Sequence, residues 1–325
     1  MVTTLRKRKQ GKTIASYEES DSDFASDPEL RSKTQQKRAK TASREKKKKQ
    51  DTETEESDTE VNQLESSSQS DKDESDSDNV TQFKPAKIKV PHPDGSPFPD
   101  SLSPKTLEFL AELAENNDRD FMHFKAKEFQ EAKQDFIDFC GLIRDELAQV
   151  DPSIRLEEPK QAVYRQNRDL RFSNDKRPYK INLSASFSRT GRKFADAGYF
   201  LSIRPGNHSM IASGMWQPDK HRLANMRSSI IRHGDLLRES LSTEAIKDVF
   251  HGKSGVEILS PEDKLKVAPK DIDKHHPEIE LLRYRSFAVV KEFTDQEVVS
   301  PGFVEKVMDF LEATVPFVTV VNSWI

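Results

Sequence analysis

The first 80 residues of this chain contain almost no large apolar side chains. Nearly every residue in this stretch is charged or is Ser, Thr or Gln, and the few large apolar residues, such as Phe24 and Leu64, stand alone. A segment of this composition buries too little apolar surface to offset the conformational entropy that folding removes. We therefore predict a long disordered tail at the N-terminus, so that only the remainder of the 325 residues can build a folded core.

Five prolines follow the tail between residues 83 and 100. Proline fixes φ, has no backbone N–H and favours an extended chain over a helix. We therefore predict that residues 1–100 comprise the charged tail and a proline-rich linker, and that residues 101–325 form one domain. The prolines are Pro85, Pro91, Pro93, Pro97 and Pro99.

Two basic groups in the tail have the spacing of a bipartite nuclear import signal. Compact cationic groups on a flexible chain fit an acidic receptor groove, and a solvated charge run is the alternative interpretation. We expect an import receptor as a partner and a nuclear protein, with the cytoplasm as a second compartment. The residues of this signal are Lys37, Arg38, Lys46, Lys47, Lys48 and Lys49.

Hydroxyl residues directly followed by carboxylates recur along the tail. Such pairs are typical of substrates of acidophilic kinases, and each phosphate would add about −1.5 to −2 charge. Phosphorylation would then mask the basic groups or create an anionic strip. The candidate phosphorylation sites are Ser20, Ser22, Ser57, Ser75 and Ser77.

Features of membrane and secreted proteins do not occur in the sequence. No stretch approaches the roughly 20 apolar residues of a membrane-spanning helix, and the first residues lack the apolar core of a secretory signal. Cys140 is the only cysteine, which excludes an intrachain disulfide, and its apolar helical surroundings predict a buried, unreactive thiol. No histidines have the His-Glu-x-x-His spacing, so we predict no metal site. We expect an intracellular protein without a membrane partner, and the sequence assigns no cofactor.

The period of the apolar residues changes along the domain. A helical period predicts helices over residues 104–116, 129–150 and 223–230, and a closing helix that starts at Ser300-Pro301. Alternation predicts strands over residues 183–187, 199–204, 209–215 and 281–293. The strands follow one another without repeated strand-helix-strand units, which favours an antiparallel sheet. The predicted fold class is α+β, with a mainly antiparallel sheet packed by helices.

Positive charge is concentrated between residues 160 and 193. This stretch contains ten Lys or Arg against two acidic residues, Asp169 and Asp175, although the whole chain has a net charge of −4. Arginine forks bind phosphate or carboxylate in a bidentate manner, and neighbouring aromatic rings provide stacking surfaces. The pattern therefore predicts a site for an anionic ligand. Its candidate residues are Arg165, Arg168, Asp169, Arg171, Asp175, Lys176, Tyr179 and Lys180.

A structural role for the same residues is the alternative interpretation. Arg168, Arg171 and the two aspartates could form an ion-pair network that holds a loop on the sheet. Surface ion pairs contribute only about 0 to 1 kcal/mol each, and a network of this kind does not require so large an excess of cations. Both interpretations stay open at this point, and in an enzyme Asp169 or Asp175 would be the candidate general base.

The motif over residues 168–180, together with Gly198-Tyr199-Phe200 and Gly214-Met215-Trp216, resembles a known family. The family is the one grouped as domain of unknown function 2461, found in bacteria and fungi. The resemblance covers most of residues 103–315 and none of the tail. It departs at residue 121, where similar sequences tend to have Trp and this chain has Phe. The family has no assigned activity, so the resemblance implies no catalytic residues.

Two functional hypotheses follow from the sequence. The first is a binding module or an enzyme for an anionic ligand that carries phosphate or carboxylate, held by the basic motif. The second is a non-catalytic nuclear interaction protein that contacts nucleic acid or an acidic partner and is regulated by phosphorylation of the tail. The sequence does not decide whether the protein is an enzyme.

Overall fold

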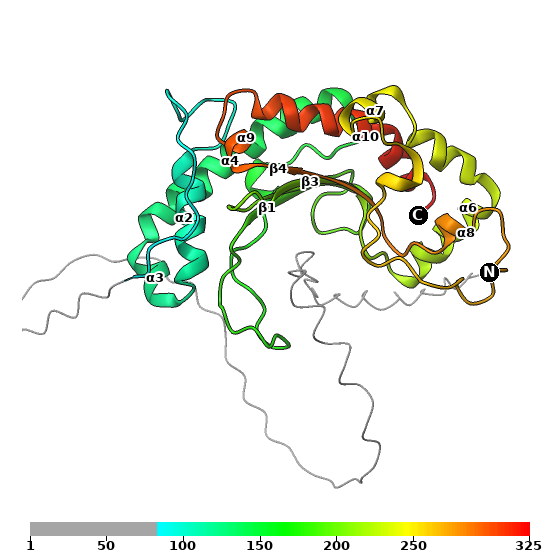
Figure 1. Cartoon of the computed structure of the whole chain (residues 1–325), viewed down its shortest axis with the longest axis horizontal. Coiled ribbons are helices and arrows are strands. Elements are labelled where there is room, and N and C mark those ends of the chain that lie inside the picture. Colours follow the sequence, from blue (N-terminus) through cyan, green and yellow to red (C-terminus); the bar gives the residue numbers. More distant parts are fainter. Residues whose placement is uncertain (1–82) are drawn as a thin grey trace, which may run out of the picture. The chain divides into compact units, whose positions relative to one another are not determined.

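The computed structural model describes residues 83–325 (Figure 1). The predicted tail disorder, the import signal over residues 37–49 and the phosphorylation sites between residues 20 and 77 lie outside the described residues. Across residues 83–325, no helix combines the length and the apolar character that a membrane crossing requires.

A four-stranded antiparallel sheet forms the centre of the fold. Its strands lie in sequence order, β1-β2-β3-β4, and each neighbouring pair is antiparallel. This arrangement confirms the predicted α+β class. The strands are β1 (Leu183–Ser188), β2 (Gly198–Ile203), β3 (Ser209–Met215) and β4 (Phe287–Phe293).

Two long helices, α4 (Ala126–Val150) and α10 (Phe303–Ser323), cover one face of the sheet (Figure 1). Thr314 on α10 and Ser213 on β3 share a hydrogen bond of 2.8 Å, and the Tyr199 hydroxyl of β2 donates to Asp151 at the end of α4 over 2.9 Å. The helices are α2 (Pro104–Glu115), α3 (Arg119–Phe124), α4 (Ala126–Val150), α5 (Pro159–Ala162), α6 (Lys220–Ser240), α7 (Glu244–Val249), the 3-10 helix η1 (Gly255–Ile258), α8 (Ile279–Leu282), α9 (Asp295–Val298) and α10 (Phe303–Ser323).

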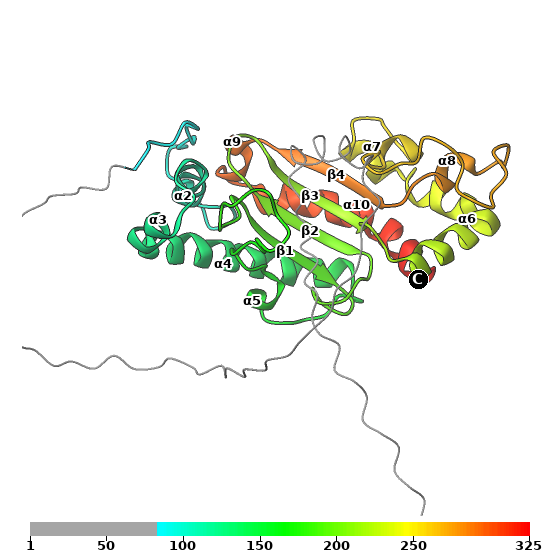
Figure 2. The same cartoon turned by 90° about the horizontal axis from the view of Figure 1, so that it is seen from below.

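The second face of the sheet is the one that positions the candidate site. Because side chains alternate along a strand, Phe200 points away from the face that carries Tyr199. Phe200 pairs with Ser186 on β1 and with Ala212 on β3, so these side chains share the second face. Figure 2 shows this face from below, and no helix of residues 83–325 lies between the strands and the viewer.

Two predicted element boundaries are wrong. The strand predicted from Leu281 begins only at Phe287, because Leu281 and Leu282 are both fully buried in the short helix α8 rather than alternating between two faces. The closing helix begins at Phe303 instead of Ser300, since the Ser300 hydroxyl donates to the Gln296 carbonyl and so completes the turn after α9.

The described part of the proline-rich segment packs on the domain. The Lys84 N–H donates to Asn116 Oδ1 over 2.7 Å, and the Asn116 amide returns a bond to the Lys84 carbonyl over 2.8 Å. The Phe83 ring lies edge-on to Phe121 at 5.2 Å between ring centroids. These residues belong to the same compact unit as the rest of residues 83–325.

Candidate functional site

Residues 166–180 form a hairpin-like arm that extends from the sheet edge beside β1 (Figure 1). The two sides of the arm are joined by backbone hydrogen bonds, from Lys180 N–H to the Gln166 carbonyl at 2.8 Å and from Arg168 N–H to the Pro178 carbonyl at 2.9 Å. The Asn117 side chain also bonds to both the N–H and the carbonyl of Tyr179, at 3.0 Å each. The base of the arm is therefore fixed to the connection between α2 and α3.

Ion pairs stiffen the outer part of the arm. Asp175 accepts hydrogen bonds from the guanidinium groups of Arg168 at 2.6 Å and Arg177 at 2.7 Å, and its side chain is only 13% exposed. The Arg177 guanidinium and, after it, that of Arg168 hold the pKa of Asp175 well below its usual range. A second pair joins Arg171 to Asp169 over 2.7 Å and lowers the pKa of Asp169 to about 2.

Half of the residues that the sequence selected thus bind one another in the arm. Arg168 with Asp175 and Arg171 with Asp169 match the ion-pair interpretation. Carboxylates with such low pKa values accept protons poorly near neutral pH, which makes them unsuited to the role of general base. At the tip, Lys176 donates to the Ser173 carbonyl over 3.0 Å.

The low pKa of Asp175 predicts a pH-dependent arm. A carboxyl group whose pKa is lower in the folded than in the unfolded state stabilises the fold. This contribution is complete above the unfolded pKa of about 3.9, and it is lost as the pH falls below that value and through the folded pKa. We expect the amides of Arg168 and Lys180 to stay protected from hydrogen exchange between pH 7 and pH ~4, and to lose protection below that. Asp175→Asn should expose both amides already at pH 7.

Hydrogen exchange measured by NMR, corrected for intrinsic rates, checks this prediction. The amides of β2 and β3 serve as the internal control, because their protection should persist while that of the arm falls. Either of two results would contradict the prediction. The arm amides of the wild type could be equally protected at pH 3 and pH 7, or those of Asp175→Asn could be as protected at pH 7 as those of the wild type.

A different set of side chains gathers where the arm returns to the sheet. The Lys180 ammonium lies 5.5 Å from the centroid of the Tyr164 ring, and the Arg192 guanidinium lies 5.0 Å from the same centroid. The Tyr164 ring packs edge-on against Phe200 of β2 at 6.0 Å. We call Tyr164, Lys180, Arg192 and Phe200 the cationic cluster.

Each member of the cationic cluster is positioned by a different segment. The Tyr164 N–H donates to the Ser184 carbonyl of β1 over 2.9 Å, and the Lys180 N–H donates to the Gln166 carbonyl at the base of the arm over 2.8 Å. Arg192 lies in the loop between β1 and β2, where its Nε donates to the Gln161 carbonyl over 3.1 Å. Because Phe200 belongs to the second face of the sheet, the cluster lies on that face, opposite to α4 and α10.

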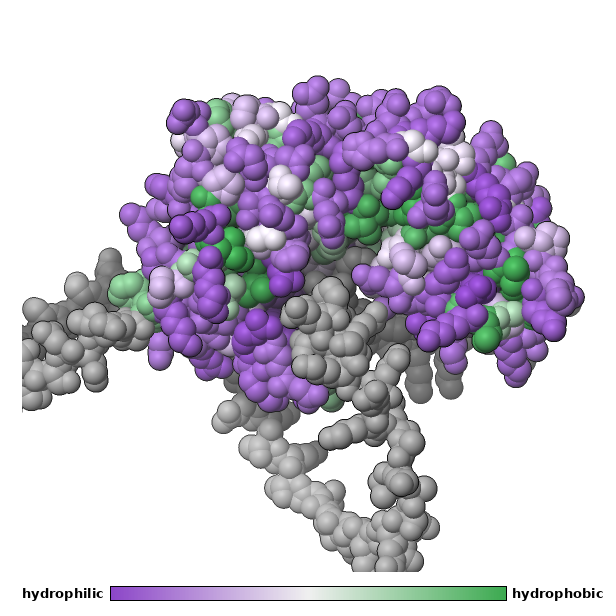
Figure 3. All heavy atoms as spheres, viewed as in Figure 1, coloured by the Kyte–Doolittle hydropathy of each residue, from purple (hydrophilic) through white to green (hydrophobic). Residues whose placement is uncertain are grey.

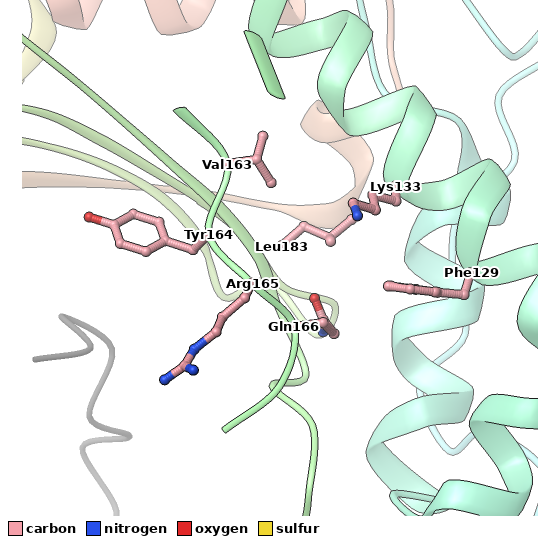
Figure 4. Close-up of a pocket in the computed structure, with 7 residues that line it drawn as sticks. All are labelled: Phe129, Lys133, Val163, Tyr164, Arg165, Gln166 and Leu183. Atoms are coloured by element: carbon pink, nitrogen blue, oxygen red, sulfur yellow. The ribbon is translucent and has the colours of Figure 1, made fainter. Parts of the chain in front are cut away.

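A pocket lies where α4, β1 and the segment 163–166 meet (Figure 4). It is lined by Phe129 and Lys133 of α4, Leu183 of β1 and residues 163–166. Figure 4 shows Tyr164 and Arg165 directed away from α4, whereas Gln166 lies on the side of α4. Tyr164 therefore belongs both to the lining of this pocket and to the cationic cluster.

Sequence reasoning selected Lys180 of the cluster but missed its partners. Tyr164 stands one residue before the selected Arg165, and Arg192 belongs to the same cation-rich stretch. The available signal was strand alternation, which places Phe200 on the face that Tyr164 can reach. Spacing alone could not show that the β1–β2 loop folds back over the start of the arm.

Comparison with known proteins places the site in a family. A sequence model described as "Conserved hypothetical protein (DUF2461)" matches residues 105–319. The chain belongs to this family. The arm and the cationic cluster both fall inside the region that the family model covers, and the match confirms the resemblance seen in the sequence. No curated protein and no solved structure matches the chain.

Other reactive groups do not join the site. In residues 83–325, no group of three or more His, Cys, Asp or Glu side chains is arranged to hold a metal ion. Cys140 is fully buried in α4, and this burial raises the pKa of its thiol. A thiol of this kind is a packing group rather than a nucleophile.

Proposed function

We propose that this domain is a binding module for an anionic ligand that carries phosphate or carboxylate groups. The observation that supports the proposal is the placement of two cations, Lys180 and Arg192, beside the Tyr164 ring on the second face of the sheet. We assign this ligand to the cationic cluster, because the Lys180 ammonium and the Arg192 guanidinium lie 5.5 Å and 5.0 Å from the centroid of the same Tyr164 ring.

The local setting of Lys180 strengthens its interaction with an anion. Only 8% of the residue surface is exposed, and charge interactions are stronger in a partly desolvated setting than in water. Arg192 provides a planar fork that matches phosphate and carboxylate oxygens. The rings of Tyr164 and Phe200 provide an aromatic surface for a base or another planar part of the ligand.

A neutral donor lies on the same face. Ser202 stands two residues after Phe200 on β2, so both side chains lie on the second face of the sheet. The Ser202 oxygen accepts a hydrogen bond from the Asn182 amide at 2.9 Å. This bond leaves the hydroxyl hydrogen of Ser202 to donate to a ligand oxygen. The site thus combines charged donors, a hydroxyl and aromatic faces.

A thermal-shift screen of the full chain tests the proposed function. The probes are pyrophosphate, AMP and citrate, each compared with sodium chloride at equal ionic strength. A ligand that binds only the native state adds about 2.7 kcal/mol of stability at 100 times its Kd, so at least one probe should raise the melting temperature. Unchanged melting temperatures with all three probes would remove the proposal.

We also propose that the tail delivers the protein to the nucleus and is phosphorylated there by an acidophilic kinase. The basis is the bipartite spacing of the basic groups and the Ser-Asp pairs, which lie outside the described residues. A fluorescent fusion of the full chain should concentrate in nuclei and should spread into the cytoplasm when Lys46, Lys47, Lys48 and Lys49 are changed to Ala. Equal distribution of the two fusions would exclude this import signal.

A further inference from the structure

The tip of the arm presents one aromatic ring to solvent. Phe172 is 94% exposed, which makes it the most exposed large apolar side chain among residues 83–325. The Arg171 guanidinium lies 5.9 Å from the centroid of this ring. Burial of such a ring is favourable, and the folded domain forgoes this gain.

The exposure of Phe172 is maintained by a rigid base. The ring extends from a loop whose two sides are joined by the ion pair between Arg168 and Asp175 at 2.6 Å, and Arg177 binds the same carboxylate from its own side at 2.7 Å. The arm therefore holds the ring away from the core of its own domain. A preorganised side chain loses little entropy on binding, which is the property of an anchor for a partner.

The arm also carries an excess of cations. Residues 166–180 contain five Lys or Arg and two Asp, so the formal charge is 5 − 2 = +3. Lys176 and Arg171 flank the exposed ring, and Arg171 is 79% exposed even though it pairs with Asp169. This combination of a ring and surrounding cations complements a chain that has planar bases and a phosphate backbone.

We propose that the tip of the arm binds single-stranded nucleic acid, with Phe172 stacked on an unpaired base and Lys176 and Arg171 beside the phosphates. This inference is independent of the anion site at the cationic cluster, because it rests on the opposite end of the arm. Stacking on an aromatic ring is tolerant of sequence, so the tip selects unpaired strands rather than a particular base.

A protein surface or a lipid surface fits the tip less well. A stable protein interface has an apolar core and buries about 800 Å² on each partner, whereas Phe172 is followed by the polar residues Ser173 and Asn174. Binding in a lipid interface requires a broad apolar face. Figure 3 shows the lower end of the described chain, where Figure 1 places the arm, as mainly hydrophilic.

Tryptophan fluorescence of the full chain tests this site without interference from binding elsewhere. Phe172→Trp places a reporter at the tip, and Val267→Trp places the same reporter at another exposed apolar position, 73% exposed, in the segment between η1 and α8. The wild type supplies the background of Trp216 and Trp324. Circular dichroism and melting temperature should agree among the three proteins, because both positions are exposed.

A 15-nucleotide oligothymidine should quench the fluorescence of Phe172→Trp to a saturable limit and leave that of Val267→Trp at the wild-type level. In the Phe172→Trp background, Lys176→Gln should reduce the slope of log Kd against log salt by about 0.7, the value for one phosphate contact on a single strand. Absence of quenching beyond the wild type, or equal quenching at both positions, would overturn the proposal. A blue shift of Phe172→Trp with phosphatidylcholine and phosphatidylserine vesicles, without quenching by the oligonucleotide, would also overturn it.

Discussion

Gly214→Ala is expected to destabilise the domain by about 3 kcal/mol or more, because the added methyl group has no space and the backbone conformation is unsuited to Ala. A Cβ atom at this position would lie 2.2 Å from the Phe287 carbonyl oxygen and 2.7 Å from the Phe317 ring, and the φ angle of Gly214 is +117°. Gly214 pairs with Gly198 on β2, so the clash falls inside the sheet. Urea unfolding of the full chain measures the change.

Gly252→Ala is the matched control for this prediction. Its φ angle of +87° is also positive, but an added Cβ atom would have no neighbour within 4 Å. Only the backbone penalty of about 1 to 2 kcal/mol then applies. If Gly214→Ala and Gly252→Ala lowered the free energy of unfolding by equal amounts, this result would contradict the close packing of Gly214 between β4 and α10.

Lys180→Gln and Arg192→Gln are each expected to weaken binding of pyrophosphate by about 10- to 100-fold. A hydrogen bond to a charged group contributes about 1.5 to 3 kcal/mol, and each 1.4 kcal/mol corresponds to a factor of ten. Because both side chains contact the Tyr164 ring, their effects should not be additive. Isothermal titration calorimetry of the full-chain variants measures the dissociation constants.

Lys253→Gln is the control for these two variants. Lys253 is exposed in the turn that follows α7, and its replacement changes the net charge of the protein by the same amount. Binding of pyrophosphate should be unchanged in Lys253→Gln. A comparable loss of pyrophosphate affinity in Lys253→Gln would show that binding depends on the net charge of the protein and not on the cationic cluster.

The sequence predicted the fold well where local signals were strong. Ser103 accepts a hydrogen bond from the Lys105 N–H and Pro104 occupies the first turn, as expected for the start of α2. The hairpin of β2 and β3 was also predicted, because the turn residues Pro205-Gly206-Asn207-His208 separate the two strands, and in the structure Gly206 and Asn207 adopt positive φ angles of 86° and 62°. The two errors concern the starts of β4 and α10. In each case a short helix, α8 before β4 and α9 before α10, precedes the longer element.

The candidate site was predicted only in part, because its residues are divided by the path of the chain. Arg168 and Lys180 were assigned to one motif, yet the structure places the first in the ion pairs of the arm and the second in the cationic cluster. Arg192 joins Lys180 through the β1–β2 loop, and Phe200 joins through the register of β2. Such contacts depend on loop paths that composition and periodicity do not specify.

The most direct test of the anion-binding claim is diffraction from crystals of the protein soaked in tungstate, a tetrahedral oxyanion with a strong anomalous signal. We predict an anomalous peak on the second face of the sheet, with tungstate oxygens within about 2.7–3.2 Å of the Lys180 ammonium and the Arg192 guanidinium. The peak should be absent in Lys180→Gln crystals soaked in the same way. Tungstate bound elsewhere on the domain, with none at the cationic cluster, would contradict the account.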